Sequence, residues 1–235
     1  MNTVPMNTSS VSLAGLFTGR AVPYTRPGSR SAIAKSPVLE SVRIHAEGIE
    51  GDEQGDRRVH GGPDKAIHHY PFDHYAFWRG EHPHPLLEHA GAFGENFSSV
   101  GWTEDDIHLA DVVRVGTATL QVSQGRQPCW KLNDRFGHPG MARTMQSSGR
   151  TGWYYRVLEA GLVTPGDVMT VLERPCAAWP LSRLVTVLFD RTLERDLLQE
   201  ASQLPLTSSW KTLLLNRLQR QEVEPWASRL DGPAR

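Results

Sequence analysis

The use of glycine divides this chain of 235 residues into two parts that must fold differently. Glycine recurs throughout the first part, but it is absent between Leu181 and Arg220. Inside a helix glycine costs roughly 1 kcal/mol relative to alanine, so its absence favours helix. Apolar residues there also recur at helical spacing, in the stripes Leu181, Leu184, Val185, Leu188 and Trp210, Leu214, Leu218. We predict a small bundle of three helices at 181–190, 193–202 and 209–221.

The first part of the chain favours short β-strands separated by long loops. Leu120 and Val122 alternate with polar neighbours, which is the pattern of a half-buried strand. Strands are predicted at 11–18, 40–45, 107–109, 112–115, 118–123, 153–159 and 168–172, and short helices after Pro71 and at 139–146. Short strands with such loops favour a barrel over a doubly wound sheet. The prediction is a mainly β fold, with a β-barrel domain at 11–173, a three-helix domain at 180–222, and tails at 1–10 and 223–235.

The composition excludes several classes of protein. Hydrophobic residues make up 39% and charged residues 22% of the chain, which argues against a disordered protein. The net charge of -1 gives no global attraction to nucleic acid or membrane, so a bound anion must be held by local charge. Two cysteines are too few for a disulfide scaffold or a four-cysteine iron–sulfur cluster. With neither an apolar signal core nor a stretch long enough to cross a bilayer, we expect a cytoplasmic protein.

Cys129 is the strongest candidate for chemistry. It follows a predicted strand, a turn and Pro128, so we expect it in the first turn of a helix. The free N–H groups at that position, together with nearby Arg126, favour the thiolate form. A thiolate is a good nucleophile and a good ligand for a soft metal. The alternative that position alone leaves open is a buried structural cysteine.

Other loops also carry residues that could bind a ligand. The two glycines after His60 would let the backbone approach a ligand closely, although a tight turn is an equal alternative. In the segment FGENF, Glu95 and Asn96 could read the edge of a heterocycle, or the segment could be an ordinary turn. A basic loop could bind phosphate or be solvated, and it contains Arg20, Arg26, Arg30 and Lys35. The spacing of His68, His69 and His74 does not favour a zinc site.

Taken in order, these segments closely resemble the MOSC-domain family, and within it the YiiM-like branch. The resembling segments are SAIAK at 31–35, GIEGDEQGDRRVHGGPDKAIHHYP at 48–71, FGENF at 93–97 and QVSQGRQPCWKLN at 121–133. The resemblance covers about residues 15–172. The segment 181–221 resembles the three-helix domain that follows the barrel in that branch.

The resemblance implies a cofactor and an activity. The barrel would bind a molybdenum cofactor, a molybdopterin whose dithiolene holds the metal, with Cys129 as the protein ligand. The family's loops around the pterin and its phosphate correspond to Arg30, Ser31, Ala32, Lys35, His60, Gly61, Gly62, His69, Phe93, Gly94, Glu95, Asn96 and Arg126. The activity would be reduction of N-hydroxylated compounds, such as N-hydroxylaminopurine, to the amine. Cys129 would act with a proton donor, for which His60 and Glu95 are the candidates.

The same resemblance implies partners and leaves two alternatives open. The chain has no room for a flavin domain, so the electrons are expected from a separate flavoprotein. The three helices could be its docking surface, or a cap or homodimer element. One alternative is a non-catalytic protein that carries the cofactor or transfers sulfur. The other is a hydrolase built from Cys129 and His60, which would act without molybdenum.

Overall fold

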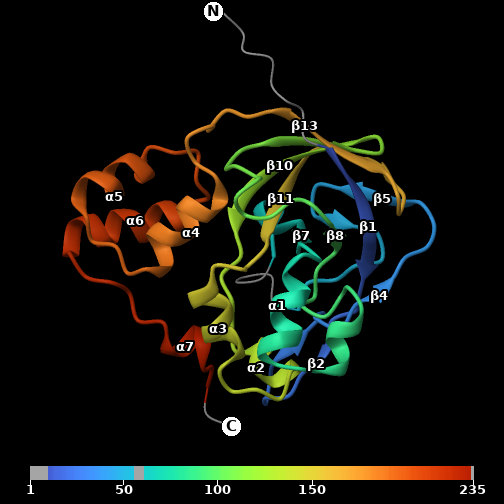
Figure 1. The fold of residues 1–235 in the computed structure, drawn as a ribbon, viewed down its shortest axis with the longest axis horizontal. Coiled ribbons are helices and arrows are strands. Elements are labelled where there is room, and N and C mark those ends of the chain that lie inside the picture. Colours follow the sequence, from blue (N-terminus) through green and yellow to red (C-terminus); the bar gives the residue numbers. More distant parts are fainter. Residues whose placement is uncertain (1–9, 56–60, 234–235) are drawn as a thin grey trace, which may run out of the picture.

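The barrel is closed by seven strands in the part of the chain that the computed structural model describes, residues 10–55 and 61–233. The strands pair in the order β13-β9-β10-β11-β7-β8-β1, and β1 pairs again with β13. β7 and β8 run parallel and the other pairs are antiparallel, so the barrel is mixed (Figure 1). The strands are β1 (Ser10–Thr18), β7 (Ile67–His69), β8 (Phe97–Ser99), β9 (Val112–Val115), β10 (Ala118–Gly125), β11 (Trp153–Glu159) and β13 (Val168–Glu173). The predicted β-barrel is confirmed.

Shorter strands lie outside this ring. β4 (Ser36–Pro37) extends the sheet at β1, and β2 (Val22–Pro23) pairs with β3 (Arg30–Ser31) inside the basic loop. A separate three-stranded sheet consists of β5 (Val42–His45), β6 (Gly48–Ile49) and β12 (Gly161–Val163). The pairing of β2 with β3 folds the basic loop back on itself, so that it can line a cavity instead of extending into solvent.

Two apolar clusters support the structure. The barrel interior holds fully buried side chains from alternate strand positions, among them Leu120 and Val122 of β10. The second cluster lies under helix α1 (His74–Glu81), where Tyr70, Trp78 and Phe93 are fully buried. Because Phe93 belongs to this cluster, the FGENF segment is fixed by packing and not only by its turn.

The predicted three-helix domain is confirmed. It consists of α4 (Leu181–Phe189), α5 (Arg195–Ser202) and α6 (Ser208–Arg220), which lie together on one side of the barrel (Figure 1). A Cβ added at Gly125 would lie 2.9 Å from Val185 Cγ2 and 3.2 Å from Trp210, so the helices approach this strand end closely. The Thr207 hydroxyl donates to Gln124 Oε1 at 2.9 Å. The bundle therefore packs on the end of β10, just before Cys129.

Some predicted elements differ from the structure. The segment 107–109, predicted as a strand, forms only an isolated bridge between His108 and Pro180. β7 and β8 are not among the predicted strands, because three residues are too few to show an alternating pattern. Cys129 does not lie in a helix, because α2 (Lys131–Arg135) begins after it. The segment predicted as a C-terminal tail contains α7 (Ala227–Leu230).

The remaining helical elements are η1 (Pro63–Lys65), η2 (Pro85–Glu88) and α3 (Met141–Ser148). In Figure 1 the chain runs from α6 to α7, which lies beside α3 and α2 and away from the other three C-terminal helices.

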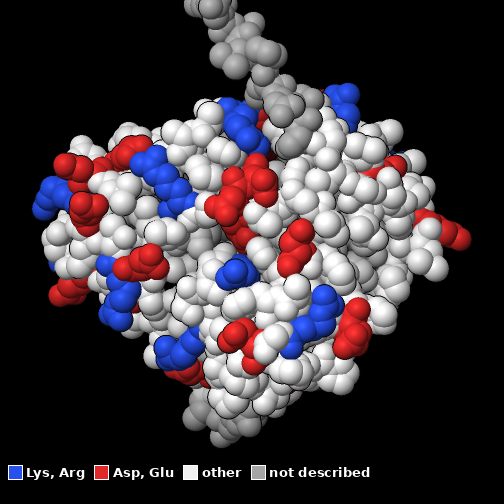
Figure 2. Space-filling model, in the orientation of Figure 1, with Lys and Arg blue, Asp and Glu red and all other residues white. Residues whose placement is uncertain are grey.

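The surface shown in Figure 2 carries Lys and Arg side chains interspersed with Asp and Glu side chains. Within the residues described, none of the helices has the length and apolar character needed to cross a bilayer.

Gly152 and Gly149 give a matched test of close packing. Both have φ of 69°, but a Cβ at Gly149 would meet nothing within 4 Å, whereas one at Gly152 would overlap the carbonyl oxygen of His69. We expect Gly149→Ala to lower the free energy of unfolding by about 1–2 kcal/mol from the left-handed backbone alone. Gly152→Ala should cost a further ~1–3 kcal/mol, because the backbone beside β7 must move. Urea unfolding of both variants measures the difference, and equal losses would contradict this packing.

Candidate functional site

Two cavities meet at Cys129, beside the loop that joins β10 to α2. The first has a volume of about 100 Å³ and the second of about 460 Å³. The residues that line both are Gly55, Lys65, Cys129, Lys131 and Tyr154. The Cys129 side chain therefore borders both spaces, and a ligand in either one can approach its sulfur.

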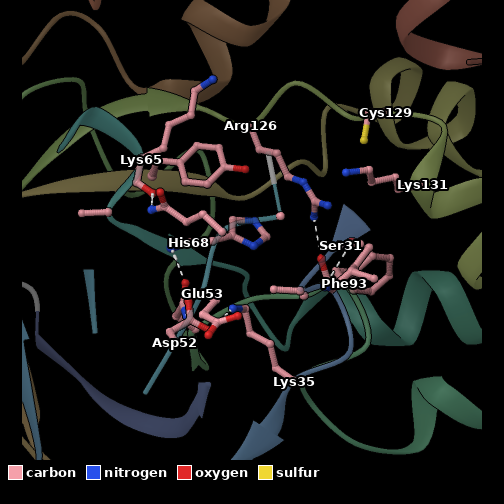
Figure 3. A pocket seen from close by; sticks show the side chains of 18 residues that line it. Ser31, Lys35, Asp52, Glu53, Lys65, His68, Phe93, Arg126, Cys129 and Lys131 are labelled. Atoms are coloured by element: carbon pink, nitrogen blue, oxygen red, sulfur yellow. Dashed lines mark hydrogen bonds and ion pairs between the residues drawn. The ribbon is translucent and has the colours of Figure 1, made fainter. Parts of the chain in front are cut away.

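Most of the predicted cofactor residues come together in the first cavity (Figure 3). It is lined by the predicted residues Ser31, Ala32, Lys35, Phe93, Gly94, Asn96, Arg126 and Cys129. They come from three separate segments, 31–35, 93–96 and 126–129, which the closure of the barrel brings to one end. Arg30 lines the second cavity instead.

Other predicted residues lie elsewhere. Gly61, Gly62, His69 and Glu95 line neither cavity, and His60 lies outside the described residues. Sequence reasoning did not select several residues that do line the two cavities, namely Asp52, Gln54, Lys65, His68, Lys131, Tyr154, Ser228 and Arg229. Lys65 and Lys131 lie inside two of the resembling segments, 48–71 and 121–133, and that position was the available signal for them. Arg229 lies in a segment predicted as a tail.

Glu95 is fully buried and fixes the loop in which it lies. Its Oε1 accepts hydrogen bonds from the Tyr75 hydroxyl at 2.5 Å and from Gly91 N at 2.7 Å, and its Oε2 accepts one from Phe93 N at 3.0 Å. Burial raises the pKa of Glu95. These contacts make Glu95 a residue that shapes the FGENF turn, and they direct its carboxyl away from the cavities.

His68 and His69 point to opposite sides of β7, as successive strand residues do. His69 lies inside the barrel, stacked on Trp153 at 4.4 Å between ring centroids. His68 instead lines the first cavity, and among the described residues its buried Nε2 has no hydrogen-bond partner. An unsatisfied buried nitrogen at a cavity wall is costly unless a ligand or water satisfies it. His68 is therefore the histidine of this pair that faces the site.

A buried polar network holds one wall of the first cavity. Lys35 Nζ forms an ion pair with Asp52 Oδ1, and Asp52 Oδ2 accepts a hydrogen bond of 2.8 Å from Asn96 Nδ2. Asn96 Oδ1 in turn accepts from the backbone N of His68 at 3.0 Å. Burial lowers the pKa of Lys35, and the nearby Asp52 opposes that shift. The network joins three loops and leaves Lys35 on the cavity wall.

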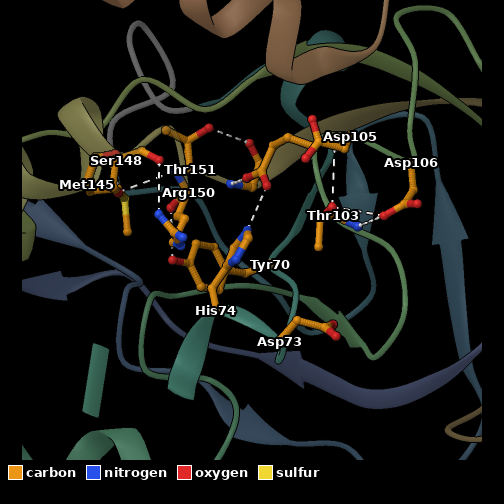
Figure 4. Close-up of polar contacts among 12 residues, drawn as sticks. Tyr70, Asp73, His74, Thr103, Asp105, Asp106, Met145, Ser148, Arg150 and Thr151 are labelled. Carbon is orange, nitrogen blue, oxygen red and sulfur yellow. Dashed lines mark hydrogen bonds and ion pairs between the residues drawn. The ribbon is translucent and has the colours of Figure 1, made fainter. Parts of the chain in front are cut away.

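Backbone carbonyl groups hold Arg126 in place. Its backbone N donates to the Gly152 carbonyl at 2.9 Å, and its Nη1 donates to the Phe93 carbonyl at 3.0 Å. Gly152 N donates to Glu104 Oε1 at 2.6 Å, and Glu104 Oε2 lies 2.6 Å from His74 Nε2 (Figure 4). This buried chain fixes the guanidinium, which Figure 3 shows pointing into the cavity below the Cys129 sulfur.

Cys129 is buried, and its surroundings differ from those expected. Its carbonyl accepts a hydrogen bond from Leu132 N at 3.0 Å, so the residue lies ahead of α2. The positive charge near the sulfur comes from side chains, because Lys65 and Arg229 are both in electrostatic contact with Cys129. Within residues 10–55 and 61–233, no group of three or more His, Cys, Asp or Glu side chains could hold a metal ion. A metal here would need further ligands from a cofactor.

Models of two protein families match the chain. The model described as MOSC domain matches residues 56–170, and the model described as YiiM-like, 3-alpha helix domain matches residues 179–221. The chain is 38% identical to Protein YiiM of Escherichia coli (strain K12), over 92% of this chain and 97% of that protein. It is 37% identical over 190 residues to a protein named Reductase from Gibberella moniliformis, covering 80% of this chain but 34% of that protein. This chain thus spans about a third of the fungal protein.

Solved structures show the same arrangement of both domains. The crystal structure of YiiM from Escherichia coli superposes with a TM-score of 0.78 at 29% identity, over 96% of this chain and 99% of that chain. A crystal structure described as that of a hypothetical protein superposes with a TM-score of 0.84 at 31% identity, over 99% of both chains.

The two histidines of β7 predict how stability depends on pH. Burial lowers the pKa of His69 from 6.5 to about 3 and that of His68 well below 6.5, so both are neutral in the folded protein. Unfolding lets them take up protons below pH 6.5, so stability falls as the pH is lowered from 6.5 towards 3. His69→Gln should reduce the slope of unfolding free energy between pH 5 and 6 by up to about 1.4 kcal/mol per pH unit.

Ser99→Ala is the control for this prediction. It removes the partner that lies 2.9 Å from His69 Nε2 but keeps the titrating ring. Urea unfolding at several pH values should therefore give the wild-type slope for Ser99→Ala. A wild-type slope for His69→Gln would show that His69 does not titrate on unfolding.

Proposed function

The chain belongs to the MOSC-domain family, in the branch with a YiiM-like three-helix domain, and from this premise we propose that it reduces N-hydroxylated compounds to amines with a molybdenum cofactor. Membership of the family implies molybdenum-cofactor binding in general. The observation that carries the proposal is the position of Cys129, which borders two cavities lined by cations. N-hydroxylaminopurine represents the proposed substrate class.

The described residues fit the chemistry of such a cofactor. Cys129 offers a soft sulfur ligand, and Arg126 and Lys65 offer charge that would balance an anionic dithiolene and phosphate. The unsatisfied Nε2 of His68 offers a hydrogen-bonding group to a heterocycle. The first cavity alone is smaller than the ~300–1,000 Å³ of ordinary ligand pockets, so the cofactor would also need space from the second.

The proposed reaction breaks an N–O bond. A hydroxylamine R–NHOH takes up two electrons and two protons and yields R–NH₂ and water. The bound cofactor would supply the two-electron chemistry. Tyr154 borders both cavities, and because burial raises its pKa, its hydroxyl stays protonated and can donate a hydrogen bond to a ligand there. The Glu95 carboxyl group accepts hydrogen bonds from Tyr75, Gly91 and Phe93 and lines neither cavity. His60 remains a candidate proton donor.

The electrons would come from a separate flavoprotein. The two cysteines of the chain cannot build a four-cysteine iron–sulfur cluster. The relative named Reductase is much longer than the region it shares with this chain, which fits a redox partner supplied in addition to the MOSC region.

Two alternatives make different predictions. A cofactor carrier or sulfur-transfer protein would bind molybdenum and pterin without reducing hydroxylamines. The hydrolase alternative takes His60 as the base on Cys129, and His60 lies outside the described residues. It predicts hydrolysis without molybdenum and inhibition by alkylation of Cys129.

The two cysteines provide a variant and its control. Cys129→Ala should lose bound molybdenum and all reduction of N-hydroxylaminopurine, because it removes the sulfur that borders both cavities. Cys176→Ala should keep both, because Cys176 lines neither cavity. The measurement is metal and pterin analysis, plus turnover with an artificial reductant, on protein from a host that makes the cofactor.

The possible results separate the three functions. Bound cofactor in the wild type without turnover would favour the carrier. Turnover by Cys129→Ala at the wild-type rate would exclude Cys129 as the ligand. Hydrolytic activity of molybdenum-free protein, abolished by alkylation, would favour the hydrolase.

A further inference from the structure

The second cavity has one sign of charge. Among the residues that the structure describes, its lining includes the cationic side chains of Arg30, Lys65, Lys131 and Arg229 and no carboxylate. The other polar groups on its wall include Gln124 and Gln127. Its volume of about 460 Å³ is within the range of small-molecule sites. A cavity with this lining favours an anion by electrostatic focusing, even in a chain with a net charge of -1.

Neutral acceptors hold three of these cations. Arg229 Nη1 donates to the Pro128 carbonyl at 2.5 Å and its Nη2 to Gln146 Oε1 at 2.6 Å. Lys131 Nζ donates to the Arg30 carbonyl at 2.6 Å, and Arg30 Nη2 donates to the Ala21 carbonyl. Carbonyl groups orient these side chains but do not neutralise them. Their positive charge is therefore available to a ligand.

Among the described residues, two carboxylates that act electrostatically on these cations also pair with other arginines. Glu224 is in electrostatic contact with Arg229, but its Oε1 accepts hydrogen bonds from Arg217 Nη2 at 2.8 Å and from Trp226 Nε1 at 2.7 Å. Asp64, next to Lys65, pairs with Arg156 at 2.8 Å. Burial lowers the pKa of both Lys65 and Arg229, which is the cost of holding a cation out of water. A bound anion would offset that cost.

Arg229 reaches the cavity from the C-terminal segment, which is fixed to the Cys129 loop. The Arg229 carbonyl accepts a hydrogen bond of 2.8 Å from Trp130 N, and the Leu230 carbonyl accepts one of 2.8 Å from Asn133 Nδ2. Leu230 is buried. This segment lies beyond both regions matched by the family models, which end at residues 170 and 221. Arg229 therefore reaches the cavity from a segment outside both matched regions.

We propose that the second cavity binds an anionic group of the substrate, so that the substrate is an N-hydroxylated base carrying a phosphate, such as a nucleoside monophosphate. The inference rests on the proposed function, because it places the hydroxylamine end of the same molecule at Cys129. Arg229 and Lys131 would recognise the phosphate, which carries about -1.5 to -2 charge at neutral pH. The pterin would occupy the first cavity, with Lys35 and Arg126, and would extend into the second only beside Cys129, where the two cavities share their lining.

The test compares N-hydroxylaminopurine riboside with its 5′-monophosphate on the cofactor-loaded enzyme. We expect kcat/KM to be at least about tenfold higher for the monophosphate, mainly through a lower KM. Arg229→Gln should bring this ratio close to one. Arg143→Gln is the matched control, because it removes an exposed cation that pairs with Asp231 of the same segment outside the cavity. It should keep the wild-type ratio.

A binding experiment shows whether the cavity binds the phosphate of the substrate or that of the cofactor. Calorimetric titration with adenosine and with its 5′-monophosphate is made on loaded and on cofactor-free wild type. Tighter binding of the monophosphate to the loaded protein, weakened in Arg229→Gln, supports the proposal. Binding only by cofactor-free protein, or loss of pterin from Arg229→Gln, would assign the cavity to the cofactor's own phosphate and overturn it.

The two proposals fail in different ways. Equal kcat/KM for riboside and monophosphate overturns the anion site but leaves the reductase intact. Absence of turnover of both compounds overturns the reductase. The difference in calorimetric affinity between adenosine and its 5′-monophosphate then still decides whether the cavity recognises phosphate.

Discussion

Concentrating positive charge around one buried cysteine is the constraint on which the site depends. Lys65, Arg126, Lys131 and Arg229 gather near Cys129 in a chain whose overall charge is close to zero. Buried cations are costly unless each is hydrogen-bonded or paired. The fold meets this requirement mainly with backbone carbonyls, such as that of Phe93 for Arg126 and that of Pro128 for Arg229. Carbonyls hold the cations in place without cancelling the field that a ligand would experience.

The barrel supplies the rigidity that these contacts need. β7 places His69 in the interior and His68 on the cavity wall, so one three-residue strand serves both packing and the site. The end of β10 is packed against the three helices through Gly125 and hydrogen-bonded to them through Thr207. The loop that follows is held by Arg229 of α7. Cys129 is thus fixed from both flanks, by the three-helix domain on one side and by α7 on the other.

The sequence predicted the elements whose signal is local. The alternation in β10 and the glycine-free apolar stripes of α4 and α6 depend only on residues within each segment, and these elements are present. β7 and β8 escaped prediction because they are short and are defined by pairing with distant strands. The motifs located Cys129, Arg126, Asn96 and Lys35 near one cavity, but they selected His69, whereas His68 is the histidine that lines the cavity. That choice depends on which face of a strand turns inward, and so on the barrel itself.

Arg229 is a site residue that could not be predicted from the sequence at all. The segment around it has no apolar periodicity of its own, and its place is set by Trp130, Asn133 and Arg26, whose hydrogen bonds it receives across the fold. Arg26 belongs to the basic loop for which the sequence left phosphate binding and solvation open, and it does neither, because it pairs with Asp134 and donates to the Asp231 carbonyl at 2.7 Å. One arginine of the basic loop therefore fastens the C-terminal segment, and that segment returns an arginine to the cavity. The sequence motifs suggested that the basic loop supplies positive charge to the site. Part of that charge comes instead from Arg229, about 200 positions later in the chain.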